Sequence, residues 1–407
     1  MKRTESRLKL GVVVILGVSS LLSSFATVAG EASRWVGTWA TSVYEGEPGR
    51  NQVADVTLRQ IAHVSIGGKQ VRVRFSNEFG SVPLEIGPAA IALSIGNGGI
   101  QADTDHALTF DGRASAKIPA GATLISDPVD WSVPALSDVA VSLYLPKQDV
   151  GSVTYHGDAR QTQYQTYGNT VHAPALENPI TQASTYFLSG IDVLADKTAH
   201  AVVALGDSIT DGAQSTRDTN RRWPDFLARR LAADKRFAQT GVLNEGIGGA
   251  RLLNPNTGPA VLARFDRDVT AQSGVSHVIV LIGINDIGRW GRPHIASDEV
   301  TAEEIIAGLK QLIVRAHDHN IKIIGATLTP YEGANYASAK GETIRQTVNQ
   351  WIRDGKQFDG VADFDAATRD TQHPSRFSAA TDSGDHLHPN DAGMEAMAGA
   401  IELALLK

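Results

Sequence analysis

"AVVALGDSITDG", residues 201–212, decides the fold of the second half of the chain. It opens with a continuous apolar run, which is typical of a strand in a parallel sheet that is buried on both faces. A Gly-Asp-Ser step follows, and an expected helix comes next. Ser208 therefore lies at the carboxyl end of a buried strand, where open α/β sheets place their ligands. Taken alone, the step fits a turn or helix-cap serine as well as a nucleophile.

The same alternation of strand and helix continues to the end of the chain. Apolar runs recur at 277–284 and 321–329, and helical periodicity appears near residues 222, 301, 339 and 390. Thr301 and Glu304 have the spacing of a capping box. Alternating strands and helices predict a three-layer α/β/α domain with a parallel sheet, which we assign to residues 198–407.

The first half of the chain has a different period. Stretches such as "VTLRQIAHVSI" (56–66) and "KQVRVRFSN" (69–77) alternate apolar and polar residues and are separated by Gly, Pro and Asp turn signals. This pattern predicts an N-terminal β-sandwich or jelly-roll domain, which we assign to residues 34–195. A length of 407 residues also favours two domains over one.

The N-terminus has the layout of a secretory signal peptide. Basic residues in "MKRTESRLK" (1–9) precede the apolar stretch "LGVVVILGVSSLL" (10–22), and small residues follow. We expect a signal peptide over residues 1–29 with cleavage after Ala29, and hence a secreted or periplasmic protein with no membrane association after cleavage. A retained membrane anchor is the alternative, although the apolar segment is shorter than the roughly 18 residues that a span needs.

Composition excludes several kinds of chemistry. The chain has no cysteine, which rules out disulfides, thiolate catalysis and cysteine-based metal sites. It carries 37 Lys and Arg against 44 Asp and Glu, a net charge of −7, without a long basic block. A nucleic-acid partner is therefore not favoured.

Three later stretches supply what a nucleophilic serine needs. "NEGIGGARLL" (244–253) has paired glycines for a tight turn with an outward amide, and "LIGINDI" (281–287) ends a buried strand in Asn285. "GDHLHPN" (384–390) places Asp385 three residues before His388, so that a carboxylate can orient an imidazole. A hydroxyl, an oriented base and amide donors together indicate acyl transfer.

In this order, Ser, Gly, Asn and Asp-x-x-His, residues 200–405 resemble the SGNH, or GDSL-like, hydrolases. The resemblance implies that Ser208 is the nucleophile, His388 the base and Asp385 its orienting carboxylate. It further implies that the oxyanion hole consists of the Ser208 and Gly249 backbone N–H groups and the Asn285 amide, with no cofactor. "RWVGTWA" (34–40), "VRVRFSNEFG" (71–80) and "TYHGDARQTQY" (154–164) resemble a two-domain, exported bacterial subgroup with an N-terminal β domain.

Two details of the site stay open on the sequence. Asp385, His386 and His388 also read as a metal trio, but the further ligands lack a signature spacing, and we expect no metal. The polar loops that contain Asn77 and His156 could narrow an open site, and we expect one of these two residues to line the acyl or alcohol pocket.

The expected function is that of an exported serine esterase acting on a small-molecule or carbohydrate ester, with carbohydrate O-acetyl groups as the first substrate. A broad short-chain or aryl esterase, or a lipase-like acylhydrolase, is the alternative. Two other classes stay open: a polysaccharide acyltransferase, and a carbohydrate-binding protein whose α/β half is inactive. Hydrolysis of a simple ester distinguishes an inactive carbohydrate-binding protein from the three enzymatic alternatives.

Overall fold

The computed structural model describes residues 1, 33–46, 52–53, 55–288 and 298–407. The expected signal peptide and its cleavage site fall on residues 2–32, which lie outside this description. Within the described ranges, we find no helix with the length and apolar character needed to cross a membrane.

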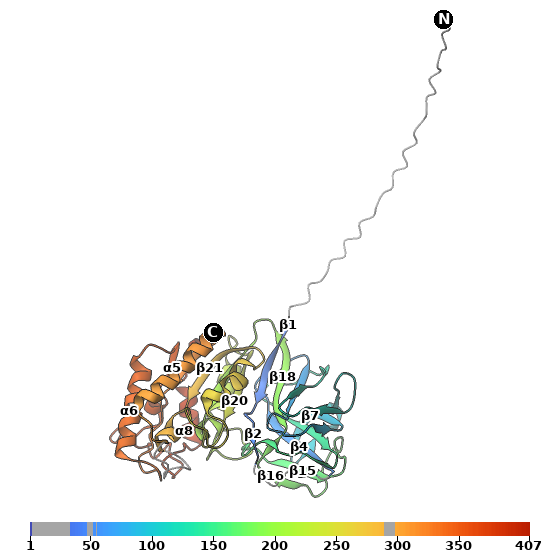
Figure 1. Cartoon of the computed structure of the whole chain (residues 1–407), viewed down its shortest axis with the longest axis horizontal. Helices are drawn as coiled ribbons and strands as arrows, with labels where there is room; N and C mark the ends of the chain where they lie inside the picture. The colour runs from blue at the N-terminus through green and yellow to red at the C-terminus, as the bar shows by residue number, and fades with distance from the viewer. Residues whose placement is uncertain (2–32, 47–51, 54, 289–297) are drawn as a thin grey trace. The chain divides into compact units, whose positions relative to one another are not determined.

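The N-terminal half is rich in β-strands, coloured blue to green in Figure 1. One antiparallel sheet has the strand order β1-β18-β5-β11, and a larger one has the order β16-β15-β4-β12-β7-β8, with β9 paired to β7. The two-residue period of the sequence is visible in β5, where buried and partly exposed side chains alternate. The strands of these sheets are β1 (Ser33–Ala40), β4 (Val56–His63), β5 (Val71–Ser76), β7 (Ala89–Gly96), β8 (Gly99–Ile100), β9 (His106–Leu108), β11 (Thr123–Ile125), β12 (Asp138–Leu145), β15 (Gln163–Tyr167), β16 (Ile180–Gln182) and β18 (Leu188–Asp196).

Short strands complete this half. A small sheet of order β17-β14-β2 brings residues near Tyr44, His156 and Tyr186 together, which matters for the site described below. The short strands are β2 (Tyr44–Glu45), β3 (Gln52–Val53), β6 (Leu84–Ile86), β10 (Ala116–Ile118), β13 (Gln148–Asp149), β14 (Thr154–His156) and β17 (Thr185–Tyr186).

The second half contains a parallel sheet of order β20-β19-β21-β22-β23. In chain order this is 2-1-3-4-5, the order of flavodoxin-like doubly wound sheets. The interior strand β19 is buried almost throughout, as its apolar run predicts. The strands are β19 (His200–Gly206), β20 (Thr240–Gly246), β21 (Val275–Leu281), β22 (Lys322–Ala326) and β23 (Gly360–Ala362).

The helices begin where the sequence signals place them. Thr301 caps α5 and exchanges side-chain and backbone hydrogen bonds with Glu304, so the predicted capping box is confirmed. Asn390 caps the last α-helix, α8, by accepting from the Gly393 N–H. The longer helices are α2 (Trp223–Ala233), α5 (Ala302–Asp318), α6 (Ala339–Asp354) and α8 (Asp391–Gly399). The shorter ones are α1 (Ser208–Asp211), α3 (Val261–Phe265), α4 (Ile284–Gly288) and α7 (Phe364–Thr368).

Residues Ser33–Lys407 pack as one compact unit, and a single buried apolar cluster runs through both halves. Strand β1 lies against β20, and the Gly37 N–H of β1 also donates to the carbonyl oxygen of Ser273, just before β21, at 2.8 Å. The approach needs glycine, because a Cβ on Gly241 would lie 2.2 Å from the carbonyl oxygen of Gly37. The domain boundary expected between residues 195 and 198 stays a prediction.

Candidate active site

The first three sequence motifs follow strands that end at the same edge of the parallel sheet. Gly206, the last residue of β19, is in register with Gly246 at the end of β20 and with Leu281 at the end of β21. The segments that leave these ends carry Ser208 at the start of α1, Gly249 in a turn, and Asn285 in α4. Three side chains or amides that are widely separated in the sequence therefore emerge side by side.

The turn into α1 holds Ser208 at the first helical position. Asp207 caps the helix, and its Oδ1 accepts from the Ile209 N–H at 3.0 Å. Gly206 is required before it, because a Cβ there would lie 2.2 Å from Oγ1 of Thr210 and 2.6 Å from the Leu281 carbonyl oxygen. At this position the Ser208 N–H has no acceptor within the helix, so this amide is available to a ligand.

Ser208, His388 and Asp385 form a continuous hydrogen-bonded chain. Oγ of Ser208 lies 2.8 Å from Nε2 of His388, and Nδ1 of His388 lies 2.7 Å from Oδ2 of Asp385. Oδ1 of Asp385 accepts from the backbone N–H groups of His388 at 2.8 Å and Leu387 at 3.0 Å. All three side chains are partly exposed, so that a substrate can reach them.

The Asp385 carboxylate is held in its ionised form. Burial acts to raise its pKa, but the hydrogen bonds from the His388 ring and from the two backbone amides lower the pKa of Asp385 well below its usual range. An ionised acceptor at Nδ1 keeps the proton of a neutral His388 on that nitrogen. Nε2 is then left free to accept a proton from Ser208.

The paired glycines after β20 have different tasks. The Gly248 N–H donates to Oδ2 of Asp211 at 3.1 Å and is therefore occupied. Gly249 has a φ of 74°, a left-handed conformation that favours glycine, and its carbonyl oxygen accepts from Nδ2 of Asn256 at 3.1 Å. Within the described part of the chain, the Gly249 N–H has no acceptor.

Asn285 is buried in α4, and both ends of its amide are engaged. Nδ2 donates to the Ala250 carbonyl oxygen at 3.0 Å, and Oδ1 accepts from the hydroxyl of Tyr336 at 3.1 Å. Since an amide nitrogen carries two hydrogens, one remains for a ligand. Sequence reasoning missed Tyr336, because a loop between β22 and α6 gives no periodic or motif signal that points to Asn285.

Asp286, the next residue, has a structural task. Its two carboxylate oxygens accept from the backbone N–H groups of Leu252 at 2.8 Å and Leu253 at 3.0 Å. Burial raises the pKa of Asp286 to about 6. The two bonds tie the loop that follows Gly249 to α4, which carries Asn285.

A buried polar network holds the carboxyl ends of β19 and β20 through hydrogen bonds to their backbone. The Arg264 guanidinium donates to the carbonyl oxygens of Gly206 at 2.8 Å and Glu245 at 2.9 Å, and also to Oδ2 of Asp268 at 2.6 Å. Ser42, from the β-rich half, places its Oγ 2.6 Å from Oε2 of Glu245 and 2.8 Å from Oδ2 of Asp268. The backbone before Ser208 and the backbone before Gly249 are therefore held by one side chain.

The Ser42 hydroxyl joins the carboxyl groups of Glu245 and Asp268. A single hydroxyl hydrogen on Ser42 cannot serve both carboxylates, so one of them must bring its own. Burial, together with the neighbouring Asp268 carboxylate, raises the pKa of Glu245. Burial acts on Asp268 in the same direction, but the Arg267 and Arg264 guanidinium groups lower the pKa of Asp268, so the extra proton belongs to Glu245.

The structure does not bring Asn77 to the site. Asn77 is fully buried, and its Nδ2 donates to the carbonyl oxygens of Val82 at 2.9 Å and Ile118 at 3.1 Å. A Cβ on Gly80 would lie 1.9 Å from Oδ1 of Asn77, so the loop closes tightly over this side chain. The expectation that Asn77 lines a substrate pocket is corrected: its amide binds carbonyl groups of its own loop and of β10.

His156 is also buried, and it does not line an open pocket. Its ring contacts Ser42 and Asp211, so the expectation of a pocket-lining residue is replaced by a contact behind the nucleophile helix. His386 is exposed, and its Nδ1 lies 2.6 Å from Oδ2 of Asp382. In the described part of the chain, no group of three His, Asp or Glu side chains is arranged to hold a metal ion.

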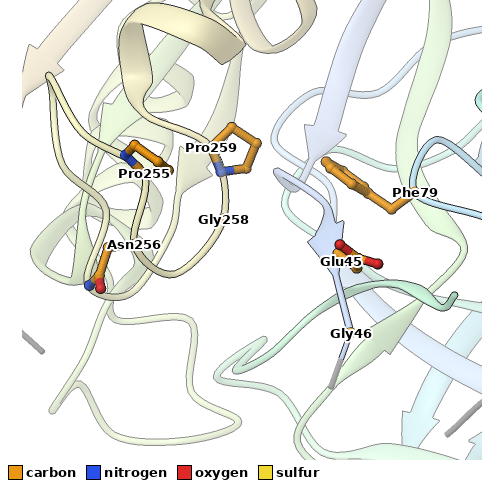
Figure 2. A pocket seen from close by; sticks show the side chains of 7 residues that line it. All are labelled: Glu45, Gly46, Phe79, Pro255, Asn256, Gly258 and Pro259. Carbon is orange, nitrogen blue, oxygen red and sulfur yellow. The ribbon is translucent and has the colours of Figure 1, made fainter. Parts of the chain in front are cut away.

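A cleft of about 560 Å³ lies beside the loop that follows Gly249. Figure 2 shows Pro255, Asn256 and Pro259 on one side of it and Phe79 and Glu45 on the other. Since Asn256 also donates to the Gly249 carbonyl oxygen, one wall of the cleft is bonded to the glycine turn. The other wall belongs to the β-rich half.

Comparison with known proteins identifies one family. Residues 204–396 match the GDSL-like Lipase/Acylhydrolase family, and this range includes Ser208, Gly249, Asn285, Asp385 and His388. A search of curated proteins found no significant match.

Solved structures resemble about half of the chain. An acetylxylan esterase from Geobacillus stearothermophilus is 25% identical, with a TM-score of 0.40, over 51% of this chain and 94% of that one. An alpha/beta hydrolase enzyme from the metagenome of Lake Arreo, Spain, is 22% identical, with a TM-score of 0.40, over 51% of this chain and 96% of that one.

Proposed function

We propose that this chain, a carboxylic ester hydrolase whose residues 204–396 are a GDSL-like lipase/acylhydrolase domain, works as a serine esterase through Ser208. The observation that carries the proposal is the hydrogen-bonded chain from Ser208 through His388 to Asp385, with distances of 2.8 and 2.7 Å. A hydroxyl in contact with an oriented neutral imidazole is the arrangement that activates a serine for acyl transfer.

In the first half of the reaction, Oγ of Ser208 attacks the ester carbonyl carbon while its proton passes to Nε2 of His388. The carbonyl oxygen becomes an oxyanion that accepts from the N–H groups of Ser208 and Gly249 and from Nδ2 of Asn285. When the tetrahedral intermediate collapses, His388 returns the proton to the leaving alcohol. The acyl group then remains on Ser208, and Asp385 stays ionised throughout.

In the second half, His388 removes a proton from water, and the hydroxide attacks the acyl carbon. The same three donors stabilise the second oxyanion, and His388 returns the proton to Oγ of Ser208 as the acid leaves. This account predicts that Ser208→Ala lowers hydrolysis of p-nitrophenyl acetate by more than about 1000-fold with an unchanged thermal midpoint. Hydrolysis by Ser208→Ala at the wild-type rate would contradict the proposal.

For the substrate, we propose a carbohydrate ester and, first among these, a sugar O-acetyl group. Support comes from the cleft beside the glycine turn, which combines the aromatic ring of Phe79 with the polar side chains of Glu45 and Asn256. An aromatic ring packs against the apolar face of a sugar, and polar side chains bind its hydroxyl groups. The Arg267 guanidinium lies over the Phe79 ring, 5.5 Å from its centre, and so holds this ring in place.

The test compares a sugar ester with a simple ester. We expect Phe79→Ala to raise KM for acetylated xylo-oligosaccharides about 5- to 20-fold, the range for one lost ring contact. KM for p-nitrophenyl acetate should stay within about twofold of the wild-type value. Tyr167→Ala is the matched control, because Tyr167 is 73% exposed on β15. Cleavage of long-chain esters without cleavage of any acetylated saccharide would favour the lipase-like alternative instead.

We also propose that the protein is exported, on the layout of residues 1–29. Expression of the full chain in a bacterial host, followed by N-terminal sequencing of the mature protein, tests this. A mature chain that begins at Gly30 in the periplasm or the medium supports the proposal. A full-length chain that stays in the cytoplasm contradicts it.

A further inference from the structure

His156 lies at the end of β14 in the β-rich half and is 2% exposed. Its Nδ1 is 2.8 Å from the carbonyl oxygen of Ser42, and its Nε2 is 3.0 Å from Oδ1 of Asp211. Both partners are acceptors. The ring can donate to both only as an imidazolium, because a neutral imidazole carries one N–H.

Asp211, the partner of His156, bridges two elements of the site. It is the last residue of α1, the short helix that begins at Ser208. Its Oδ1 faces His156, and its Oδ2 accepts from the Gly248 N–H at 3.1 Å. The carboxylate therefore connects the nucleophile helix to the glycine turn that precedes Gly249.

We propose that His156 is a positioning residue of the oxyanion hole, acting through Asp211 to hold the Gly248–Gly249 turn against the helix that begins at Ser208. The inference rests on the esterase function proposed above. It assigns the β-rich half a part in catalysis, since the side chain that orients Asp211 comes from a strand more than fifty residues earlier. His156 does not touch substrate.

Contacts around the ring keep this pair closed to solvent. Tyr44 from β2 approaches His156 edge-on with ring centres 6.0 Å apart, and its hydroxyl accepts from the Gly157 N–H at 3.0 Å. A Cβ on Gly246 would lie 2.3 Å from the Asp211 backbone nitrogen, so α1 and the end of β20 are also in close contact. Little room remains for the turn to shift while the pair is intact.

Several charged groups act on the imidazolium. Burial acts to lower the pKa of His156, but Asp211, and with it the carboxylate of Asp158, raise that pKa to about 9. Arg222, at the start of α2, faces Asp211 but is paired with Asp225, with Nε 2.7 Å from the carboxylate. Burial also raises the pKa of Tyr44 well above its usual value, so Tyr44 stays neutral while His156 titrates.

The variants are His156→Ala, which removes both donors, and His156→Gln, which keeps an N–H for Asp211. His172→Gln is the matched control, because His172 is an exposed histidine of the same half whose Nδ1 also pairs with a carboxylate, that of Asp105, at 2.7 Å. For each variant we would measure kcat and KM for p-nitrophenyl acetate from pH 6 to 10, the thermal midpoint, and amide exchange of residues 245–250.

For His156→Ala we expect kcat to fall about 10- to 100-fold, with KM within about twofold of the wild-type value. This loss is smaller than the roughly 100- to 1000-fold decrease in kcat that follows removal of an oxyanion donor. His156→Gln should recover part of this loss. Amide exchange of residues 245–250 should be faster in His156→Ala than in the wild type. Wild-type kcat should fall above about pH 9, and His156→Gln should lack this limb. His172→Gln should match the wild type in all four measurements.

Three results would overturn the inference. One is a lower thermal midpoint in the His156 variants with kcat and the exchange of residues 245–250 unchanged, because His156 would then only stabilise the fold. The second is a loss of kcat in His172→Gln equal to that in His156→Ala. The third is a fall of kcat above about pH 9 that persists in His156→Gln. If His156→Ala does not fold, the kcat of His156→Gln and the pH dependence of kcat in the wild type and in His156→Gln test the inference. A wild type that cleaves no ester would refute the proposed function, while the exchange measurement would still test the contact.

Discussion

Tyr336→Phe removes one hydroxyl that lies outside every motif of the sequence, and the structure predicts a catalytic cost. The hydroxyl donates to Oδ1 of Asn285 at 3.1 Å, and Asn285 is 2% exposed. Without this donor, the amide keeps only the bond from Nδ2 to the Ala250 carbonyl oxygen, at 3.0 Å. Burial raises the pKa of Tyr336 well above its usual value, so the hydroxyl keeps its proton at every assay pH.

The magnitude follows from what is lost and what remains. Deleting one oxyanion donor outright costs about 100- to 1000-fold in kcat, which is the expected effect of Asn285→Ala. Tyr336→Phe leaves that donor present but held at one end only, so we expect a smaller loss of about 10- to 50-fold, or about 1.4–2.3 kcal/mol. The buried Oδ1 left without a donor should also lower the free energy of unfolding by about 1–3 kcal/mol.

The assay is a double-mutant cycle on kcat for p-nitrophenyl acetate. If Tyr336 acts through Asn285, the double variant Tyr336→Phe/Asn285→Ala should be no slower than Asn285→Ala. Tyr331→Phe is the control, because this buried tyrosine lies in the same loop with its ring centre 6.1 Å from that of Tyr336. An unchanged kcat in Tyr336→Phe, or fully additive losses in the cycle, would refute the reasoning.

Three other predictions follow from the same geometry. Asp385→Asn should lower kcat less than His388→Ala, because backbone contacts still hold the loop; equal losses in a steady-state assay would contradict this. Burial raises the pKa of Asp207 to about 7 and of Asp286 to about 6, and it also raises the pKa of Glu245. The folded chain therefore binds protons more tightly than the unfolded chain, and the thermal midpoint should fall as pH rises from 5 to 9. A calorimetric midpoint that rises over this range would show the sign to be wrong. Glu245→Gln, which mimics the protonated carboxyl, should keep stability at pH 7 within about 1 kcal/mol, whereas Arg264→Met should lose about 3–5 kcal/mol in chemical denaturation.

The sequence predicted the catalytic half well because its signals are local. Buried strands read as apolar runs, and each ends just before a Ser, Gly or Asn that strand register then aligns, as Gly206 aligns with Gly246. Asp385 and His388 are three residues apart, so their contact could be read from spacing alone. Caps such as Thr301 are short-range patterns of the same kind.

The supporting contacts could not be predicted, because they join residues far apart in the chain. Tyr336 meets Asn285, and His156 meets Asp211, through loops without a period. The prediction for Asn77 is wrong because it rests on polarity alone. A polar loop residue is expected to reach a ligand, but the Asn77 amide is fully buried against carbonyl groups of the β-rich half. Which way a polar side chain points depends on the tertiary packing around it.

The most direct test of the central claim is peptide mass spectrometry after treatment with a fluorophosphonate. The account predicts one stoichiometric phosphonyl adduct, located on Ser208, and its absence from Ser208→Ala. The reagent adds to a serine only when a neighbouring base accepts its proton, so His388→Ala should label far more slowly. An adduct on a different serine, or labelling of Ser208→Ala at the wild-type rate, would contradict the assignment of Ser208 as the nucleophile.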